Sequence, residues 1–111
     1  MTYRKTFQVA GILFLLVLSS GCAKYGAALI TTDPEGAEVV DMSDDTVFGV
    51  TPVKVWWKEH GERRVFVNVR LQKEGYRDKT TSFWVNLDHA NRGDALKNAP
   101  PVEVNLDKAE E

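Results

Sequence analysis

The stretch RVFVNVRLQ, residues 64–72, alternates apolar and polar side chains along its whole length. Val65, Val67, Val69 and Leu71 fall on one face, and the polar residues fall on the other face together with Phe66. A period of two is typical of a strand that rests one side on a core. The stretch therefore predicts a long, half-buried strand, and the residues on either side of it continue the same period.

Shorter stretches of the same character precede and follow this strand. Strands are expected at residues 27–32, 37–41, 53–57, 79–87 and 102–106, with turn residues between them. Their further inward positions are Val53, Val55 and Trp57, then Thr81, Phe83 and Val85, then Val102, Val104 and Leu106. Helical spacing is confined to residues 88–97, which could form a turn or two before Pro100 and Pro101. The expected fold is all-β, a small β-sandwich of about six to seven short strands.

Residues 1–21 have the layout of an export signal. Arg4 and Lys5 precede the unbroken apolar run VAGILFLLVL, residues 9–18, and small residues lead from there to Cys22. As a helix such a run spans about 15 Å, half of a hydrocarbon core of roughly 30 Å. The segment is therefore expected to direct export and to be cleaved, without crossing a bilayer.

Cys22 is the only cysteine of the chain, which excludes an intramolecular disulfide. The motif LSSGC, residues 18–22, resembles the lipobox of bacterial lipoproteins. The resemblance implies a diacylglycerol on the Cys22 thiol, cleavage just before it, and acylation of the new amino group by a chain such as palmitate. At about 0.8 kcal/mol per buried CH₂, two or three chains would hold the protein on a membrane. A plain secretory signal with an accidental free cysteine is the alternative.

The residue after Cys22 indicates in which membrane the lipoprotein is expected to be anchored. Ala23 stands where an aspartate would resemble an inner-membrane retention signal of enteric bacteria, so the outer membrane is favoured in a Gram-negative host. Residues 22–26 are expected to be a lipidated linker, residues 27–107 the β domain, and residues 108–111 an acidic C-terminal tail. Removing Arg4 and Lys5 with the signal changes the formal net charge from −2 to −4. This balance disfavours nucleic-acid binding, which needs a basic footprint.

The tetrad Asp33-Pro34-Glu35-Gly36 lies between two short β runs. Aspartate first, proline second and glycine fourth are the preferred residues of a type I turn. The tetrad is therefore interpreted as a structural bend and not as a working site. Gly75 is expected to serve a second turn, after the long strand.

The same residues carry a resemblance to a known family. The run ALITTDPEGAEVVD, the Gly49-Val50-Thr51-Pro52 turn and the Gly75-Tyr76 pair are similar to those of the PEGA domain, a small β-rich module of envelope proteins. The likeness covers nearly all of residues 27–107. It implies no catalytic activity, and an envelope-associated structural or interaction role.

Residues that could carry chemistry are few. His60 and His89 are expected in loops, and the sequence has no ligand spacing of a zinc site. Residues 41–45 are acidic but lack the spacing of a calcium loop, which favours a solvated turn. Tyr76 is expected to pack against the hairpin. Since no nucleophile or acid–base pair is evident, the chain is expected not to be an enzyme, and no cofactor or metal is expected.

One surface remains as a candidate site. If Val65, Val67 and Val69 point inward, Phe66 points outward, and the same period turns Trp56 and Trp84 outward. Pairing of neighbouring strands can set Phe66 opposite Trp84. The candidate interaction surface consists of Trp56, Phe66 and Trp84 with the cations Arg64 and Arg70.

Two functions of this surface are considered. A third possibility is that the surface has no binding function. The first is a membrane-anchored lipoprotein whose β domain is a structural or protein-interaction module with an envelope protein as its partner. The second is a module that binds glycan or peptidoglycan. The alternative to both is that residues 88–101 or the first strands cover the aromatic rings and make them a second core layer.

Overall fold

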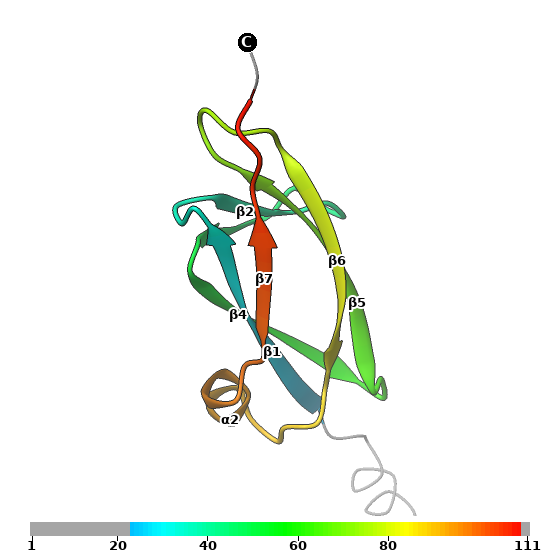
Figure 1. Cartoon of the computed structure of the whole chain (residues 1–111). Coiled ribbons are helices and arrows are strands. Elements are labelled where there is room, and N and C mark those ends of the chain that lie inside the picture. Colours follow the sequence, from blue (N-terminus) through cyan, green and yellow to red (C-terminus); the bar gives the residue numbers. More distant parts are fainter. Residues whose placement is uncertain (1–22, 110–111) are drawn as a thin grey trace, which may run out of the picture.

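The computed structural model describes residues 23–109. Within that range the chain forms seven strands and one short helix (Figure 1). The strands are β1 (Ala23–Asp33), β2 (Glu38–Asp41), β3 (Val47–Val50), β4 (Val53–His60), β5 (Arg64–Gln72), β6 (Lys79–Asn86) and β7 (Pro101–Asn105), and the helix is α2 (Arg92–Lys97). The predicted all-β fold is confirmed.

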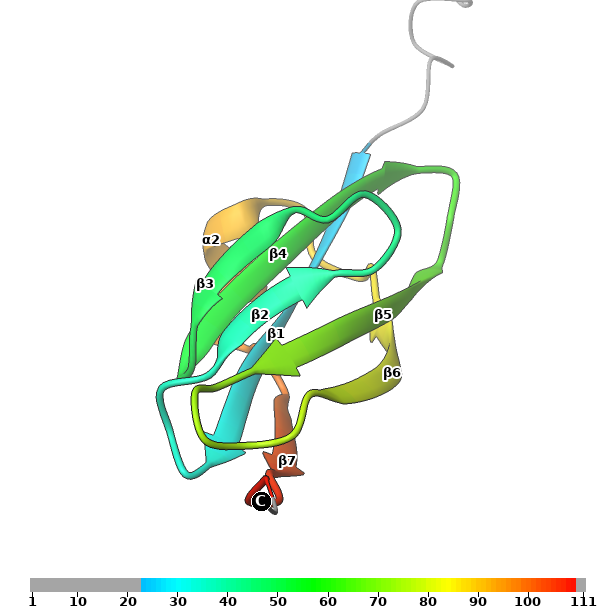
Figure 2. The same cartoon turned by 90° about the horizontal axis from the view of Figure 1, so that it is seen from above.

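The strands form two sheets that lie face to face (Figure 2). The three-stranded sheet has the order β4-β1-β7, in which β1 is antiparallel to β4 and parallel to β7. The four-stranded sheet has the order β3-β2-β5-β6 and is antiparallel throughout. The chain changes sheet four times, between β1 and β2, between β3 and β4, between β4 and β5, and between β6 and β7.

The core lies between the two sheets and follows the predicted alternation. On β5, Val67, Val69 and Leu71 are buried while Phe66 and Asn68 between them are exposed. Ile30, Val39, Val69 and Leu71 are the largest fully buried side chains within residues 23–109. Because a slip by one residue would turn these apolar side chains to solvent, the alternation excludes a register shifted by one residue.

Both ends of the described chain belong to strands or turns, which differs from the prediction. Residues 23–26, predicted as a linker, form the first part of β1 and pair with the last residues of β4. Lys108 and Ala109, predicted as part of a tail, lie against the β5–β6 turn. There Tyr76 pairs with Lys108, and Ala109 N donates to Gly75 O over 3.0 Å. Tyr76 also packs on the core, as predicted, and Gly75 has a φ of +83°.

Residues 47–50 form an edge strand, β3, where the sequence analysis predicts no strand and places the start of the Gly49–Pro52 turn. The stretch is only four residues long and includes Gly49, so its period is too short to recognise. β3 gains order from its pairing with β2 and from Phe48, which packs on the core. Tertiary contacts thus override a weak local signal.

The Asp33–Gly36 tetrad is a bend, as predicted, and it lacks the hydrogen bond that often closes a type I turn. Gly36 N donates to Thr51 O over 3.1 Å, and Asp33 O accepts from Leu106 N over 2.9 Å, so no hydrogen bond closes the tetrad on itself. The Asp33–Pro34 peptide is cis. Gly36 has a φ of +96°, a conformation that favours glycine. The bend is therefore held by partners from distant parts of the chain.

No helix within residues 23–109 is long and apolar enough to cross a membrane. The expected signal, residues 1–21, and the expected lipidation site, Cys22, lie outside the described residues. So do the last two residues of the expected tail, 110–111. In Figure 1, β1 begins at the end of the molecule that carries α2, and the C-terminal segment leaves at the opposite end.

Candidate interaction surface

Phe66 and Trp84 form an aromatic pair on the outer face of the four-stranded sheet. They lie directly opposite one another on β5 and β6, which confirms the predicted pairing. Their ring centroids are 4.9 Å apart and their planes are inclined by 51°. Phe66 is 49% exposed and Trp84 is 53% exposed. The two rings therefore pack on one another, within the distance range of aromatic pairs, and still present apolar area to solvent.

Two arginines extend this pair along β5. The guanidinium carbon of Arg64 lies 4.1 Å from the centroid of the Trp84 ring, a cation–π contact. Arg70 follows on the same face, and its enclosed Nε has no hydrogen-bond partner within residues 23–109. Between them, Ser82 donates to the side chain of Asn68. We call Arg64, Phe66, Arg70 and Trp84 the β5–β6 surface.

Trp56 does not belong to this surface, and the prediction that the three aromatic residues share one face is wrong. Trp56 lies on β4, which pairs with β1 in the other sheet and not with β5. It is outward-facing there, opposite Ala27, and 40% exposed. The prediction assumed that β4 and β5 form a hairpin. Residues 61–63, with Gly61 at a φ of +80°, instead carry the chain from one sheet to the other.

The helix α2 covers part of the face on which Trp56 lies. Asn91 caps the helix by accepting from Asp94 N over 2.8 Å, and Ala95 is fully buried. The Arg92 guanidinium lies 5.1 Å from the Trp56 ring, and the Tyr25 ring lies 6.1 Å from it. Residues 88–101 therefore cover part of the Trp56 ring, as the alternative expected. They leave the rings of Phe66 and Trp84 exposed to solvent.

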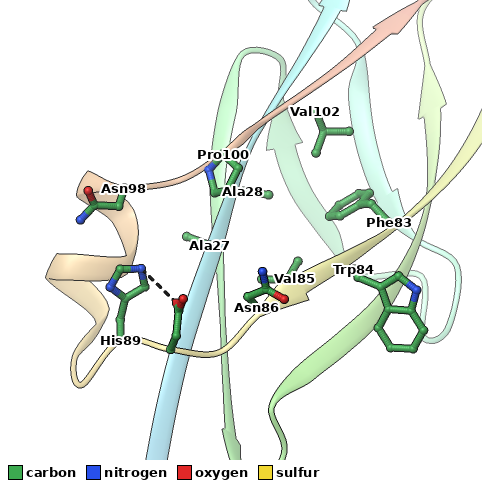
Figure 3. A pocket seen from close by; sticks show the side chains of 11 residues that line it. Ala27, Ala28, Phe83, Trp84, Val85, Asn86, His89, Asn98, Pro100 and Val102 are labelled. Atoms are coloured by element: carbon green, nitrogen blue, oxygen red, sulfur yellow. Dashed lines mark ion pairs between the residues drawn. The ribbon is translucent and has the colours of Figure 1, made fainter.

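A cavity lies between β6 and the segment that leads into β7 (Figure 3). Its volume is about 150 Å³. Phe83, Val85, Ala28 and Val102 contribute apolar side chains, and polar groups gather at the end near α2, where His89 Nε2 lies 3.3 Å from Asp88 Oδ1. The Trp84 ring points away from the cavity in Figure 3, so Trp84 borders it through its backbone.

The sequence analysis predicted that the inward-facing residues lining this cavity are core residues, and it predicted no cavity. A period of two shows that Phe83 and Val85 point inward, but it does not show that β6 ends a sheet and leaves space beside them. No local signal could have found the cavity, because its walls come from β1, β6 and the segment before β7.

The remaining polar candidates lie apart from one another. His60 is exposed at the end of β4, and His89 contacts its neighbour Asp88. In the acidic turn, the Asp41 carboxylate accepts from Ser43 N over 2.9 Å. Hydrogen bonds from the Thr46 side chain and backbone lower the pKa of Asp44. Within residues 23–109, no group of three or more His, Cys, Asp or Glu side chains is placed to hold a metal.

Comparison of the chain with protein-family models, with curated proteins and with solved structures gave no match. The function is therefore inferred from the contacts and exposure of the described residues and from the motifs of the sequence.

Proposed function

We propose that the chain is a membrane-anchored envelope lipoprotein whose PEGA-like β domain binds another envelope protein through the β5–β6 surface. The observation that carries the proposal is the half-exposed Phe66–Trp84 pair beside Arg64. Tryptophan, phenylalanine and arginine are enriched at protein interfaces, and tryptophan and arginine dominate the residues whose loss costs most binding energy. A rigid antiparallel sheet holds these side chains in place, so little order is lost on binding.

The geometry of the rings favours a protein partner over a glycan. A sugar ring stacks on a flat, open aromatic face. Arg64 already lies over one face of Trp84, and Phe66 is inclined by 51° to the Trp84 ring, so the pair offers no continuous flat platform. Edges and tilted faces of this kind suit the interdigitated side chains of a protein interface.

The anchoring part of the proposal rests on the sequence motif LSSGC and on the position of β1. The strand begins at Ala23, directly after Cys22. A lipid on Cys22 would therefore hold the domain close to the bilayer, with the end that carries α2 nearest to it. A partner on the same membrane would meet a tethered surface at a high effective concentration.

Cross-linking in living cells tests the proposal, with Trp84→Ala and Trp56→Ala as a matched pair of variants. Trp84→Ala should lower the yield of the cross-linked partner about tenfold, the effect of losing one interface anchor of roughly 1 to 2 kcal/mol. Trp56→Ala removes an equally large exposed ring from the other sheet and should leave the yield unchanged. The melting temperature of Trp84→Ala should stay close to that of the parent, because half of its side chain is already in solvent.

Two results would count against the proposal. If Trp84→Ala lowers stability and leaves the cross-linking yield unaltered, the ring serves the fold. If the domain sediments with purified peptidoglycan or surface polysaccharide in a Trp84-dependent manner, and no protein is cross-linked, the partner is a glycan.

A further inference from the structure

We propose that the partner adds an extended segment, as an extra strand, to the free edge of β6. This inference rests on the proposed function, since it takes the partner to be a protein and specifies how it binds. β6 is the last strand of the four-stranded sheet, and no described strand pairs with its other edge. Unpaired backbone groups at such an edge are a template for another strand.

The hydrogen bonds of the sheet show which backbone groups are free. Leu87 N donates to Arg63 O over 2.8 Å, so these two residues form a hydrogen-bonded pair. Hydrogen-bonded and non-hydrogen-bonded pairs alternate along an antiparallel ladder. Phe66 and Trp84 therefore form a non-hydrogen-bonded pair, as do Asn68 and Ser82. The N–H and C=O groups of Ser82 and Trp84 consequently point away from β5.

The chain itself limits this edge at both ends. At one end β1 passes so close that a Cβ added to Gly26 would lie 2.2 Å from Asn86 O. At the other end Lys79 Nζ donates to Asn105 O over 2.7 Å. The open part is thus the backbone of Ser82 and Trp84, which offers two donors and two acceptors.

The cavity beside this edge can receive a side chain of the added strand. A volume of about 150 Å³ accommodates a molecule the size of benzene, and the part of the cavity lined by Phe83, Val85, Ala28 and Val102 is apolar. It therefore has room for one leucine or valine side chain. Side chains of a strand alternate between the two faces of its sheet, so the neighbours of that residue would lie on the outer side, next to Trp84. One added strand would fill the cavity and cover the aromatic pair together.

Charge indicates what the outer side chains of the segment should be. The outward positions of β5 and β6 carry Arg64 and Arg70 and no acidic residue. The occupant is therefore an extended segment with one apolar side chain turned inward and carboxylates turned outward. A second copy of this chain fits less well, because it would bring its own arginines to the same face.

Selection of peptides tests the inference on the full-length chain in detergent micelles. The probe is a phage-displayed pool of random peptides of about eight residues, the length of an ordinary strand. Selected peptides should share one apolar residue whose immediate neighbours in the sequence are aspartate or glutamate. When one of them is synthesised and bound, amide hydrogen exchange at Ser82 and Trp84 should slow about tenfold or more, because those amides become hydrogen-bonded. Failure to select a peptide, or unchanged exchange at both amides, would overturn the inference.

Two matched comparisons make the test specific for backbone pairing. Ser82→Pro removes one free N–H, at an edge position where proline is tolerated, and should weaken the peptide about tenfold. Ser82→Ala keeps the N–H and loses only the side-chain bond to Asn68, so it should bind like the parent. On the unaltered chain, N-methylation of a peptide amide that faces β6 should abolish binding, and methylation of the next amide, which faces away, should not.

The outcomes separate this inference from the proposed function. Suppose that Ser82→Pro binds the peptide like Ser82→Ala, and that methylation at an amide facing β6 has no more effect than methylation at the next amide. If Trp84→Ala still lowers cross-linking in cells, the partner uses the aromatic pair without adding a strand. The inference then fails and the proposed function stands. Concentration-dependent dimerisation that Ser82→Pro abolishes would make the occupant a second copy and would also overturn the inference.

Discussion

Thr51 is the residue that ties the Asp33–Gly36 bend to the rest of the molecule. Its buried hydroxyl accepts from Ala37 N over 3.0 Å and from Gly36 N over 3.1 Å, and it lies 2.6 Å from the Thr32 hydroxyl. Two turns, each of which connects one sheet to the other, are thereby joined by one side chain. Since buried polar groups are costly when unpaired, this network favours a single arrangement of the bend.

Gly36 provides the sharpest prediction for the bend. Gly36→Val should lower the free energy of unfolding by about 1 kcal/mol or more, because a β-branched residue is strained at a φ of +96°. Glu35→Gln is the control and should cost little, since Glu35 is exposed at the next position. Urea unfolding followed by tryptophan fluorescence measures both variants.

If Glu35→Gln abolished partner binding and left the unfolding curve unchanged, the bend would be a binding site and not only a structural element. A Gly36→Val variant as stable as the parent would show that the backbone relaxes there without strain.

At the scale of elements, α2 decides which aromatic face is open. The helix is short, and its stability depends on its cap and on Ala95, which is buried against the three-stranded sheet. The segment that contains it could have covered either sheet. Pairing of Tyr25 with His89 places the segment beside β1, so α2 lies over the face that carries Trp56.

Removal of the α2 cap tests whether this element is held as described. Asn91→Ala should lower the free energy of unfolding by about 1 kcal/mol, because Asp94 N loses its acceptor. Asn91→Asp retains a capping oxygen and should be close to the parent. Both variants are compared by urea unfolding, and equal stability of Asn91→Ala and the parent would show that the helix does not depend on its cap.

At the scale of the whole molecule, the start of β1 directly after the expected lipid site would fix how the domain is held at a membrane. β1 begins at Ala23, and residues 23–26 are paired with β4. A lipid on Cys22 would therefore act on a folded strand without an intervening linker. The domain would be held near the bilayer by its α2 end, with the opposite end and the C-terminal segment directed away from it.

Replacement of the anchoring residue tests this arrangement. Cys22→Ser should release the protein from membranes or leave its precursor uncleaved, because the thiol that would carry the diacylglycerol is absent. Fractionation of cells into soluble and membrane parts, with mass spectrometry of the mature N-terminus, measures both results. Ala23→Ser, a small-residue change beside the anchor, is the control. Membrane retention of a correctly cleaved Cys22→Ser protein would contradict lipid anchoring.

Local patterns in the sequence were sufficient to predict six of the seven strands and their inward faces, but not β3 or the first four residues of β1. The alternation in residues 64–72 and 79–86 placed Phe66 and Trp84 outward, because a slip by one residue would turn the apolar sides away from the core. Their position directly opposite one another was one of the registers that this alternation allows, and the structure has that register. The bend at residues 33–36 followed from its composition, through the conformations that proline and glycine permit.

Only the tertiary structure decided which sheet each strand joins, and with it the membership of the site. Trp56 was placed with Phe66 because consecutive strands often pair, yet β4 pairs with β1, which lies far from it in the sequence. The assignment of strands to sheets also determines the free edge of β6, the adjacent cavity and the position of α2 over Trp56. They depend on contacts between distant segments, whose free energy is summed over the whole core and is not encoded in any short stretch of residues.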